Sequence, residues 1–313
     1  MQHNTFNNYI DLEKQRLIQY LSDDLQQLVT QLLPQWHNRQ NLNQILSQSF
    51  QQESSLQSCQ HLYLVDTKGI QISANISKME IDENKYGQDL SQRPYLKEHP
   101  AGETVWLSEV YVNQLDSESC ITAVLALQQD DNLLGYLIAD FSLLSLPVSE
   151  TAIADRRVWL QVKGDPAIRG TLFQQSRIHS LVDENIDDTI DILDELMKKR
   201  GIFHAKLHFS SARISLWLFD DPYRYRIHQY DELRQSCLAY PPRPYPEQAS
   251  VAKDKIKTVF QQFKTLRFMD DTIYLRAGSL NIINGMVSLN FSCDGTHYLP
   301  MEEFLAKPDF YLS

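Results

Sequence analysis

The chain has 313 residues and a formal net charge of −11, from 29 Lys and Arg against 40 Asp and Glu. This balance excludes the broad surplus of basic side chains that nucleic-acid binding needs, so we expect no nucleic-acid partner. An apolar fraction of 42% is enough for folded cores. At about 150 residues per domain, the length favours two domains.

Several features of the sequence predict a cytoplasmic protein. Apolar runs of about 18 residues are missing, so we expect no membrane span. The N-terminus lacks the basic segment and apolar core of a signal peptide. The cysteines are widely separated, which is typical of reduced thiols rather than a disulfide framework. They are Cys59, Cys120, Cys237 and Cys293.

The first 60 residues predict two amphipathic helices. Apolar residues at spacings of three and four predict a long helix over 7–33, which Pro34 ends. A second amphipathic segment follows over 42–50. The leucine stripe of the long helix needs an apolar partner, and we expect this helix to carry a homodimer contact as well. The stripe consists of Leu17, Leu21, Leu25, Leu28 and Leu32.

The apolar period then changes to that of strands. Two strands are predicted first, a mostly irregular segment with one short helical piece follows, and three antiparallel strands end the region. This order is typical of a PAS-like antiparallel sheet, with the long N-terminal helix packed across its back. The predicted strands cover 61–66, 70–74, 104–113, 120–128 and 133–141, and the helical piece covers 93–99.

Within residues 56–146 the chain resembles the Cache sensor domains, also called PDC sensors. The resemblance is carried by consecutive segments, and the Arg93-Pro94-Tyr95 step combined with a final Gly-x-Leu-x-x-Asp strand is its most specific part. The segments are Tyr63–Gly69, Gly87–Leu96, Leu107–Val112 and Leu134–Phe141. Such domains are typical of bacterial-type sensors, which hold small carboxylates or amino acids between the sheet and the irregular segment.

The resemblance implies a ligand site and names its residues. Arg93 and Tyr95 match the ligand contacts of the family, and Tyr111 and Thr122 lie on strands that would line the same site. A guanidinium binds a carboxylate through two parallel hydrogen bonds, which suits this role. The alternative is that Arg93 pairs with a carboxylate such as Asp89 and binds no ligand.

Residues 148–313 resemble no characterised family, and their pattern predicts a second α+β domain with an antiparallel sheet. The Asn284-Gly285 step predicts a turn. The predicted strands cover 158–162, 203–209, 213–219, 223–228, 272–277 and 285–293, and the predicted helices cover 185–200 and 251–264.

The meander over 203–228 carries a group of basic residues. If they share one sheet face, they form a patch for an anion or an acidic partner. The alternative is a solvated face whose charges pair with Asp220 and Asp221. The patch consists of His204, Lys206, His208, Arg224 and Arg226, with Arg213 and His228 beside it.

Other chemistry finds little support in the sequence. His204 and His208 would lie about 13 Å apart along a strand, too far to share a metal. Cys293 and His297 are interpreted as part of a turn, and the acidic series over 184–195 as a solvated helix face. Phosphate-loop, dinucleotide, GxSxG, GGDEF and EAL motifs are missing. We therefore expect no metal, no cofactor and no catalytic residue.

These observations combine into one hypothesis, with two alternatives. The chain is predicted to have a helical lead-in and Cache-like domain at 1–147 and an α+β domain of unknown role at 148–313. It would sense a small carboxylate or amino acid in the cytoplasm and signal by contact with an unidentified protein. The first alternative is an enzyme with a C-terminal or interdomain site, drawing on residues such as His204, His208, Arg224 and Asp294. The second is an interaction module that uses the basic meander.

Overall fold

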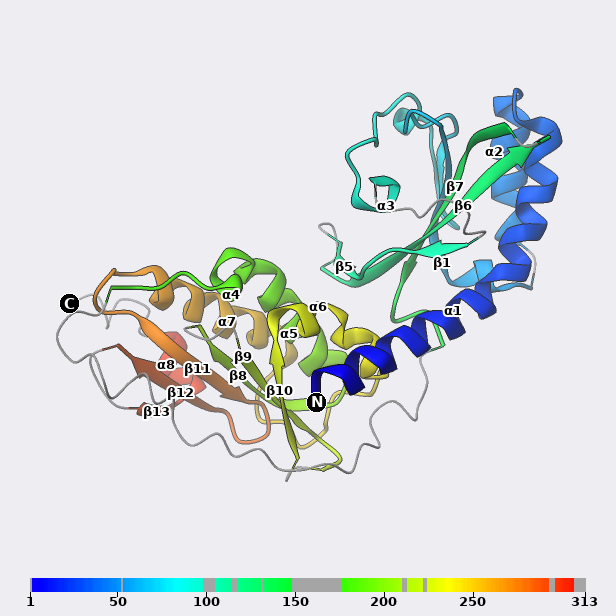
Figure 1. Ribbon diagram of the computed structural model, residues 1–313. Coiled ribbons are helices and arrows are strands. Elements are labelled where there is room, and N and C mark those ends of the chain that lie inside the picture. The colour runs from blue at the N-terminus through cyan, green and yellow to red at the C-terminus, as the bar shows by residue number, and fades with distance from the viewer. Residues whose placement is uncertain are drawn as a thin grey trace. The chain divides into compact units, whose positions relative to one another are not determined.

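The computed structural model divides the chain into two compact units, Met1–Ser149 and Glu150–Ser313 (Figure 1). None of the helices in the described residues combines the length and apolar character that a membrane crossing needs. The structure describes residues 2–51, 53–97, 105–113, 117–130, 132–147, 176–209, 213–221, 224–292 and 296–306.

The N-terminal unit is built on one seven-stranded antiparallel sheet. Its strand order is β3-β2-β1-β7-β6-β4, and β5 also pairs with β6. The first strand of the unit therefore lies beside the last, which is the order of a PAS-like sheet. The strands are β1 (Cys59–Asp66), β2 (Asn75–Ile76), β3 (Ile81–Asp82), β4 (Trp106–Leu107), β5 (Tyr111–Val112), β6 (Ser119–Gln129) and β7 (Asn132–Ser142).

Helices cover one face of this sheet. Helix α1 (Gln2–Leu32) and helix α2 (Arg39–Ser49) lie along it, joined by a short 3-10 turn at Leu33–Gln35 (Figure 1). The leucine stripe of α1 is at most 3% exposed, because it packs inside its own unit. We predicted a homodimer contact through the helix that carries this stripe. The leucines themselves are buried and are not available for such a contact, so the prediction is corrected for them.

Gly135 on β7 shows how closely the helical layer approaches the sheet. A Cβ atom at this position would lie 2.7 Å from the indole of Trp36 and 2.2 Å from the carbonyl oxygen of Val65. Such distances leave no room for a side chain, so glycine is required where the indole rests on the strand.

The opposite face is covered by the segment between β2 and β6. It contains a 3-10 turn at Glu83–Lys85 and the short helix α3 (Pro94–Lys97). An apolar cluster joins this segment to β1, β6 and β7, and it includes Leu90 and Tyr95 from the segment. The predicted strand over 70–74 is replaced by isolated bridges at Ile70 and Gln71, and the predicted strand over 104–113 by the two short strands β4 and β5.

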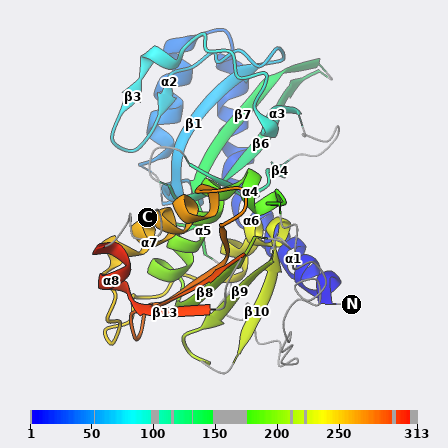
Figure 2. The ribbon, with the colours of Figure 1, turned by 90° about the vertical axis from the view of Figure 1, so that its left-hand side faces the viewer.

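The C-terminal unit is a six-stranded antiparallel sheet with helices on one face (Figure 2). Its order is β10-β9-β8-β11-β12-β13. The strands are β8 (Ile202–His208), β9 (Arg213–Leu218), β10 (Tyr225–Gln229), β11 (Leu275–Asn281), β12 (Met286–Phe291) and β13 (Thr296–Pro300). The helices are α4 (Leu181–Glu184), α5 (Ile186–Lys199), α6 (Tyr230–Ala239), α7 (Lys253–Phe268) and α8 (Met301–Ala306).

This unit consists of two similar halves. Each half runs helix, three-strand meander, helix, and the halves meet where β8 pairs with β11. Strands β8 and β11 begin at residues 202 and 275, and β9 and β12 at 213 and 286, the same offset in both cases. At that offset Leu207, Ser215 and Leu216 correspond to Leu280, Ser288 and Leu289. The halves are thus structural repeats.

The predicted fold class is confirmed in both units: a PAS-like antiparallel sheet with a long N-terminal helix, then an α+β unit with an antiparallel sheet. The predictions missed helix α6, strand β13 and helix α8. Gly285 has a φ of 69° in the turn between β11 and β12, as the Asn-Gly step predicted. The strand predicted over 158–162 lies outside the described residues.

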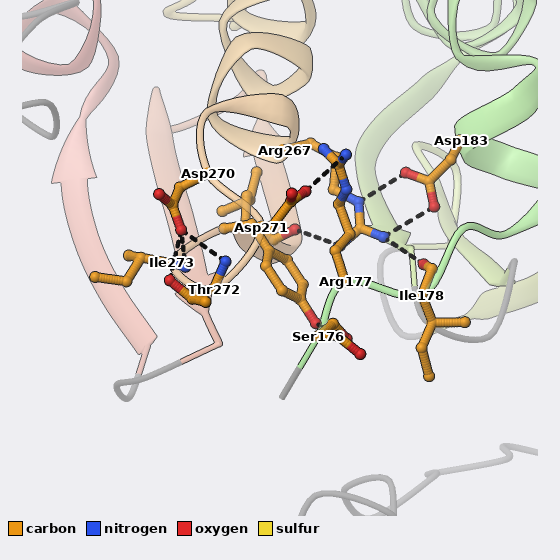
Figure 3. A network of polar contacts seen from close by, with 11 residues as sticks. Ser176, Arg177, Ile178, Asp183, Arg267, Asp270, Asp271, Thr272 and Ile273 are labelled. Carbon is orange, nitrogen blue, oxygen red and sulfur yellow. Dashed lines mark hydrogen bonds and ion pairs between the residues drawn. The ribbon is translucent and has the colours of Figure 1, made fainter. Parts of the chain in front are cut away.

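A buried ion pair ties α7 to the start of the C-terminal unit (Figure 3). The Arg267 Nε and Nη2 atoms donate to the two carboxylate oxygens of Asp183, at 2.7 and 2.9 Å. Arg267 is 1% exposed, and Nη2 also donates to the Ile178 carbonyl oxygen at 2.8 Å. Its guanidinium lies over the rings of Phe209 and Tyr274. Arg267 therefore connects α7 to α4, to the segment directly before α4 and to the residues that flank strands β8 and β11.

We expect Arg267→Ala to lower the free energy of unfolding by about 3–5 kcal/mol, because it leaves the Asp183 charge buried without its partner. Urea unfolding followed by circular dichroism measures this loss. The control is Lys264→Ala on the same helix, which breaks an exposed pair with Asp187 and should cost less than about 1 kcal/mol. Equal losses in the two variants would contradict the expected role of Arg267.

Candidate functional site

A row of polar side chains crosses the central strands of the N-terminal sheet. Asp140 on β7 lies between His61 on β1 and Thr122 on β6, each directly opposite it in the strand register. Directly paired residues in antiparallel strands point to the same face, so the three side chains stand side by side. This face is the one that the segment between β2 and β6 covers.

Asp140 is the centre of a hydroxyl cluster. The Thr122 hydroxyl donates to its Oδ1 atom at 2.7 Å, and the Tyr111 hydroxyl reaches the same oxygen at 3.5 Å. The Tyr111 and Thr122 hydroxyls are also 3.1 Å apart. Thr122 is fully buried, whereas Asp140 and Tyr111 are partly buried. An acidic group therefore lies under the covering segment with neutral hydroxyls around it.

Burial raises the pKa of Asp140 above its usual value, because a desolvated carboxylate favours its neutral form. The hydrogen bond from Thr122 and then the charges of His61 and Arg93 act in the opposite direction. The carboxylate thus lies in surroundings where an added positive charge would be favourable.

Tyrosines form the second part of the cluster. The hydroxyls of Tyr63 on β1 and Tyr95 on α3 are 2.9 Å apart in the buried interior. Burial raises the pKa of Tyr95 to about 12 and also raises the pKa values of Tyr63 and Tyr111. All three phenols therefore stay protonated at neutral pH and can donate hydrogen bonds.

Arg93 lies directly before α3 and is exposed. Its guanidinium makes no hydrogen bond or ion pair with the described residues, but its charge acts on both Asp140 and Tyr95. The alternative pairing with Asp89 is not formed in this structure, where the Asp89 carboxylate accepts from the Ser91 backbone N–H at 2.9 Å. A cation that has no ionic partner among the described residues thus lies within electrostatic reach of the Asp140 cluster.

The structure brings Tyr95, Tyr111 and Thr122 together around Asp140, with Arg93 at the edge of the cluster. Their role as ligand contacts stays a prediction. Sequence reasoning missed Asp140, His61 and Tyr63 as site residues, although Asp140 ends the strand motif quoted for the resemblance. The alternation along β1 and β7 is the signal that could have found them, because it places all three on one face.

The basic patch predicted for the C-terminal meander is divided between two sheet faces. The register pairs His204 with Trp217, and Arg226 with Leu216 on the opposite face. His204, Lys206 and His208 share one face, whereas Arg226 lies on the helix-covered face. Arg224 precedes β10 and forms an ion pair with Asp221 at 2.8 Å. The five residues therefore do not form one surface.

His204 also adds no positive charge to that surface at neutral pH. Its ring stacks on Trp217 with the ring centroids 4.5 Å apart, and both ring nitrogens are buried without a hydrogen-bond partner in the described part of the chain. Burial, followed by the charge of Lys206, lowers the pKa of His204 to about 4. The imidazole is therefore neutral at pH 7.

Other groups considered in the sequence have structural partners or lie outside the described residues. Asp187 and Asp191 on α5 form ion pairs with lysines of α7, so part of the acidic series joins two helices. Cys293 and Asp294 lie outside the described residues. Within the described part of the chain, no group of three or more His, Cys, Asp or Glu side chains is arranged to hold a metal ion.

The comparisons with known proteins give a family match for the N-terminal unit. Residues 1–134 match the model of an EAL-domain associated signalling protein domain. Together with the strand order of the sheet, this match supports a Cache-like sensor fold for the N-terminal unit. A search of curated proteins finds no match.

Solved structures show weak likeness. The Bacillus subtilis YkuI protein, which has an EAL domain and was solved with c-di-GMP and calcium, is 17% identical, with 45% of this chain and 34% of that chain aligned and a TM-score of 0.32. The ligand-binding domain of Campylobacter jejuni chemoreceptor Tlp3, solved with L-norvaline, is 16% identical, with 45% and 59% aligned and a TM-score of 0.32.

The ligand-binding domain of Pseudomonas fluorescens chemoreceptor CtaA, solved with L-isoleucine, is 17% identical, with 45% of this chain and 58% of that chain aligned and a TM-score of 0.31. In all three cases the alignment covers less than two thirds of the solved chain. The ligands named here belong to the solved proteins and assign no ligand to this chain.

The buried carboxylate makes a prediction about stability. Because the pKa of Asp140 is raised in the folded state, wild-type stability is lost as pH rises from the usual value near 3.8 through the raised pKa. Asp140→Asn removes this loss and keeps an oxygen that can accept from Thr122. We expect the variant to melt at a higher temperature than wild type at pH 7.5, with a smaller difference at pH 4.

The matched control is Asp23→Asn on the exposed surface of α1, which should leave the melting temperature unchanged at both pH values. Differential scanning calorimetry measures all three proteins. A lower melting temperature for Asp140→Asn at pH 7.5 would show that the charge of Asp140 stabilises the unit.

Proposed function

We propose that the N-terminal unit binds a small carboxylate or amino-acid ligand at the Asp140 cluster and that the chain signals this binding by contact with another protein. The observation that carries the proposal is the exposed guanidinium of Arg93, without an ionic partner among the described residues, within electrostatic reach of the partly buried Asp140 carboxylate. One cation and one anion of this kind suit a ligand that carries both charges.

Each part of the cluster has a chemical task in this proposal. The planar guanidinium of Arg93 binds the ligand carboxylate through paired N–H donors. The Asp140 carboxylate accepts hydrogen bonds from the ligand ammonium, which replaces the water lost on burial. The Tyr95 hydroxyl, which stays protonated, donates to a ligand oxygen. The apolar cluster around Leu90, which includes Tyr95, walls the site.

The match to a signalling domain supports the second part of the proposal. Ligand contacts from Arg93 and Tyr95 come from the covering segment, whereas Asp140 and Thr122 come from the sheet. A ligand held by both would order the segment against the sheet. That change in order can be passed to a partner protein or to a second copy through the exposed surface of α1, where Tyr20 is 45% exposed.

Arg93→Ala should abolish or strongly weaken binding. We expect thermal-shift screening of small carboxylates and amino acids to find a ligand that raises the melting temperature of the wild type, and Arg93→Ala to bind it at least about tenfold more weakly by calorimetry. Lys97→Ala is the control, because Lys97 is an exposed cation on the short helix that directly follows Arg93. Equal binding by Arg93→Ala and wild type would remove Arg93 from the site.

Asp140→Asn distinguishes the two ligand classes. If the ligand is an amino acid, the variant loses the negative charge that attracts the ammonium group, and affinity falls by at least about tenfold. If the ligand is a carboxylate without an amine, the variant loses a nearby repulsive charge and affinity is kept or increased. Isothermal titration with an amino acid and its deaminated analogue, against both proteins, measures the difference.

The alternative of an enzyme with a C-terminal site draws less support from the described residues. His204 and His208 share one face of β8, but Arg224 is held by Asp221 and precedes β10. The buried group of Glu232, His228 and Tyr240 is a further set of titratable side chains, with His228 Nε2 and the Tyr240 hydroxyl 3.0 Å apart. Burial raises the pKa of Tyr240, which makes its hydroxyl a poor nucleophile.

A further inference from the structure

His61 is the one member of the polar row whose side chain has an unsatisfied atom. Its Nδ1 atom is buried and has no hydrogen-bond partner among the described residues. The histidine lies directly opposite Asp140, and the strand register shifts between Cys59 and His61, next to this pair. Leaving a buried polar atom unpaired is unfavourable, so a ligand that pairs with it gains affinity.

The neighbours of His61 define its electrostatic setting. Asp140 faces it from β7, the Thr122 and Tyr63 hydroxyls flank the same carboxylate, and the charge of Arg93 acts there from the covering segment. The charge that His61 can carry lowers the pKa of Asp140 against the larger effect of burial. The His61 Nδ1 atom can donate a hydrogen bond to a ligand carboxylate.

The charges around the cluster then match one class of ligand. The Arg93 guanidinium and the His61 Nδ1 atom are donors for two carboxylates, and the Asp140 carboxyl group is an acceptor for one ammonium group. An amino acid with an acidic side chain has two carboxylates and one ammonium, which is the complementary set. An amino acid with an apolar side chain would leave the His61 Nδ1 atom unpaired, and a site with an unpaired buried polar group discriminates strongly against such ligands.

We propose that His61 is a specificity-determining residue that makes the site selective for amino acids with an acidic side chain. This inference rests on the proposed function, since it assigns the side-chain contact of the same ligand. In this arrangement Arg93 holds the α-carboxylate, Asp140 holds the ammonium group and His61 donates to the side-chain carboxylate.

Isothermal titration of the full chain at pH 7 with L-glutamate, L-aspartate and their amides L-glutamine and L-asparagine tests the proposal. Wild type should bind at least one acidic amino acid about tenfold or more tightly than its amide. His61→Gln keeps a hydrogen-bonding side chain but no positive charge, and it should bring the two affinities to within about threefold. His37→Gln, at an exposed position, should leave the wild-type preference unchanged.

The outcomes separate this proposal from the proposed function. If wild type binds none of these amino acids or their apolar counterparts, the proposed amino-acid site is wrong. The proposed specificity is then wrong as well. If amino acids bind in an Arg93-dependent way without an acidic preference, or if the preference survives in His61→Gln, the site stands and the role of His61 is wrong. An equal loss for acidic and neutral ligands in His61→Gln would mean that His61 only positions Asp140. If His61→Gln does not fold, His61→Asn serves as the second variant.

Discussion

The N-terminal unit depends on placing one carboxylate, Asp140, in the middle of a sheet. The central position of β7 gives this side chain neighbours from β1 and β6, and the covering segment removes most of its water. Hydroxyls from Thr122 and Tyr111 satisfy part of the carboxylate without neutralising it. The surroundings of Asp140 are therefore partly desolvated, which raises the pKa of its carboxyl group and makes the ionised form unfavourable for stability.

The two faces of that sheet have separate tasks. The face that carries Gly135 is packed so closely against Trp36 that a single Cβ atom cannot be added. The leucine stripe of α1 is buried in the packing on this side of the unit, which makes this side of the sheet rigid. The other face has short strands and a four-residue helix instead of long elements. In the function that we propose, a bound ligand orders the described part of this cover against the sheet.

The C-terminal unit is held together differently, by repetition and by buried arginines. Its two halves place similar strands on either side of the β8–β11 pairing. Arg267 binds Asp183, and Arg200 binds Glu195 in the interior, where it also donates to the Cys237 carbonyl oxygen at 2.6 Å. Each guanidinium joins elements distant in sequence, so this unit uses its buried charges for structure. Among the described residues of the N-terminal unit, Asp140 is hydrogen-bonded by hydroxyls and has no such guanidinium partner.

The sequence by itself determined the secondary-structure types that have a strong period: the long helix α1, the strands β1, β6 and β7, and the β8–β10 meander. It also determined the PAS-like order and pointed to Arg93, because motifs and alternation are local properties.

The tertiary structure decided what local pattern cannot express. Strand register placed His61 opposite Asp140 on the neighbouring strand. It also placed Arg226 and His204 on opposite faces of the C-terminal sheet. The helix α6, the last strand and the repeat were missed because their signals are weak within one segment. Charge and burial depend on neighbours brought together across the chain, so only the fold could show which carboxylate is desolvated and which histidine stays neutral.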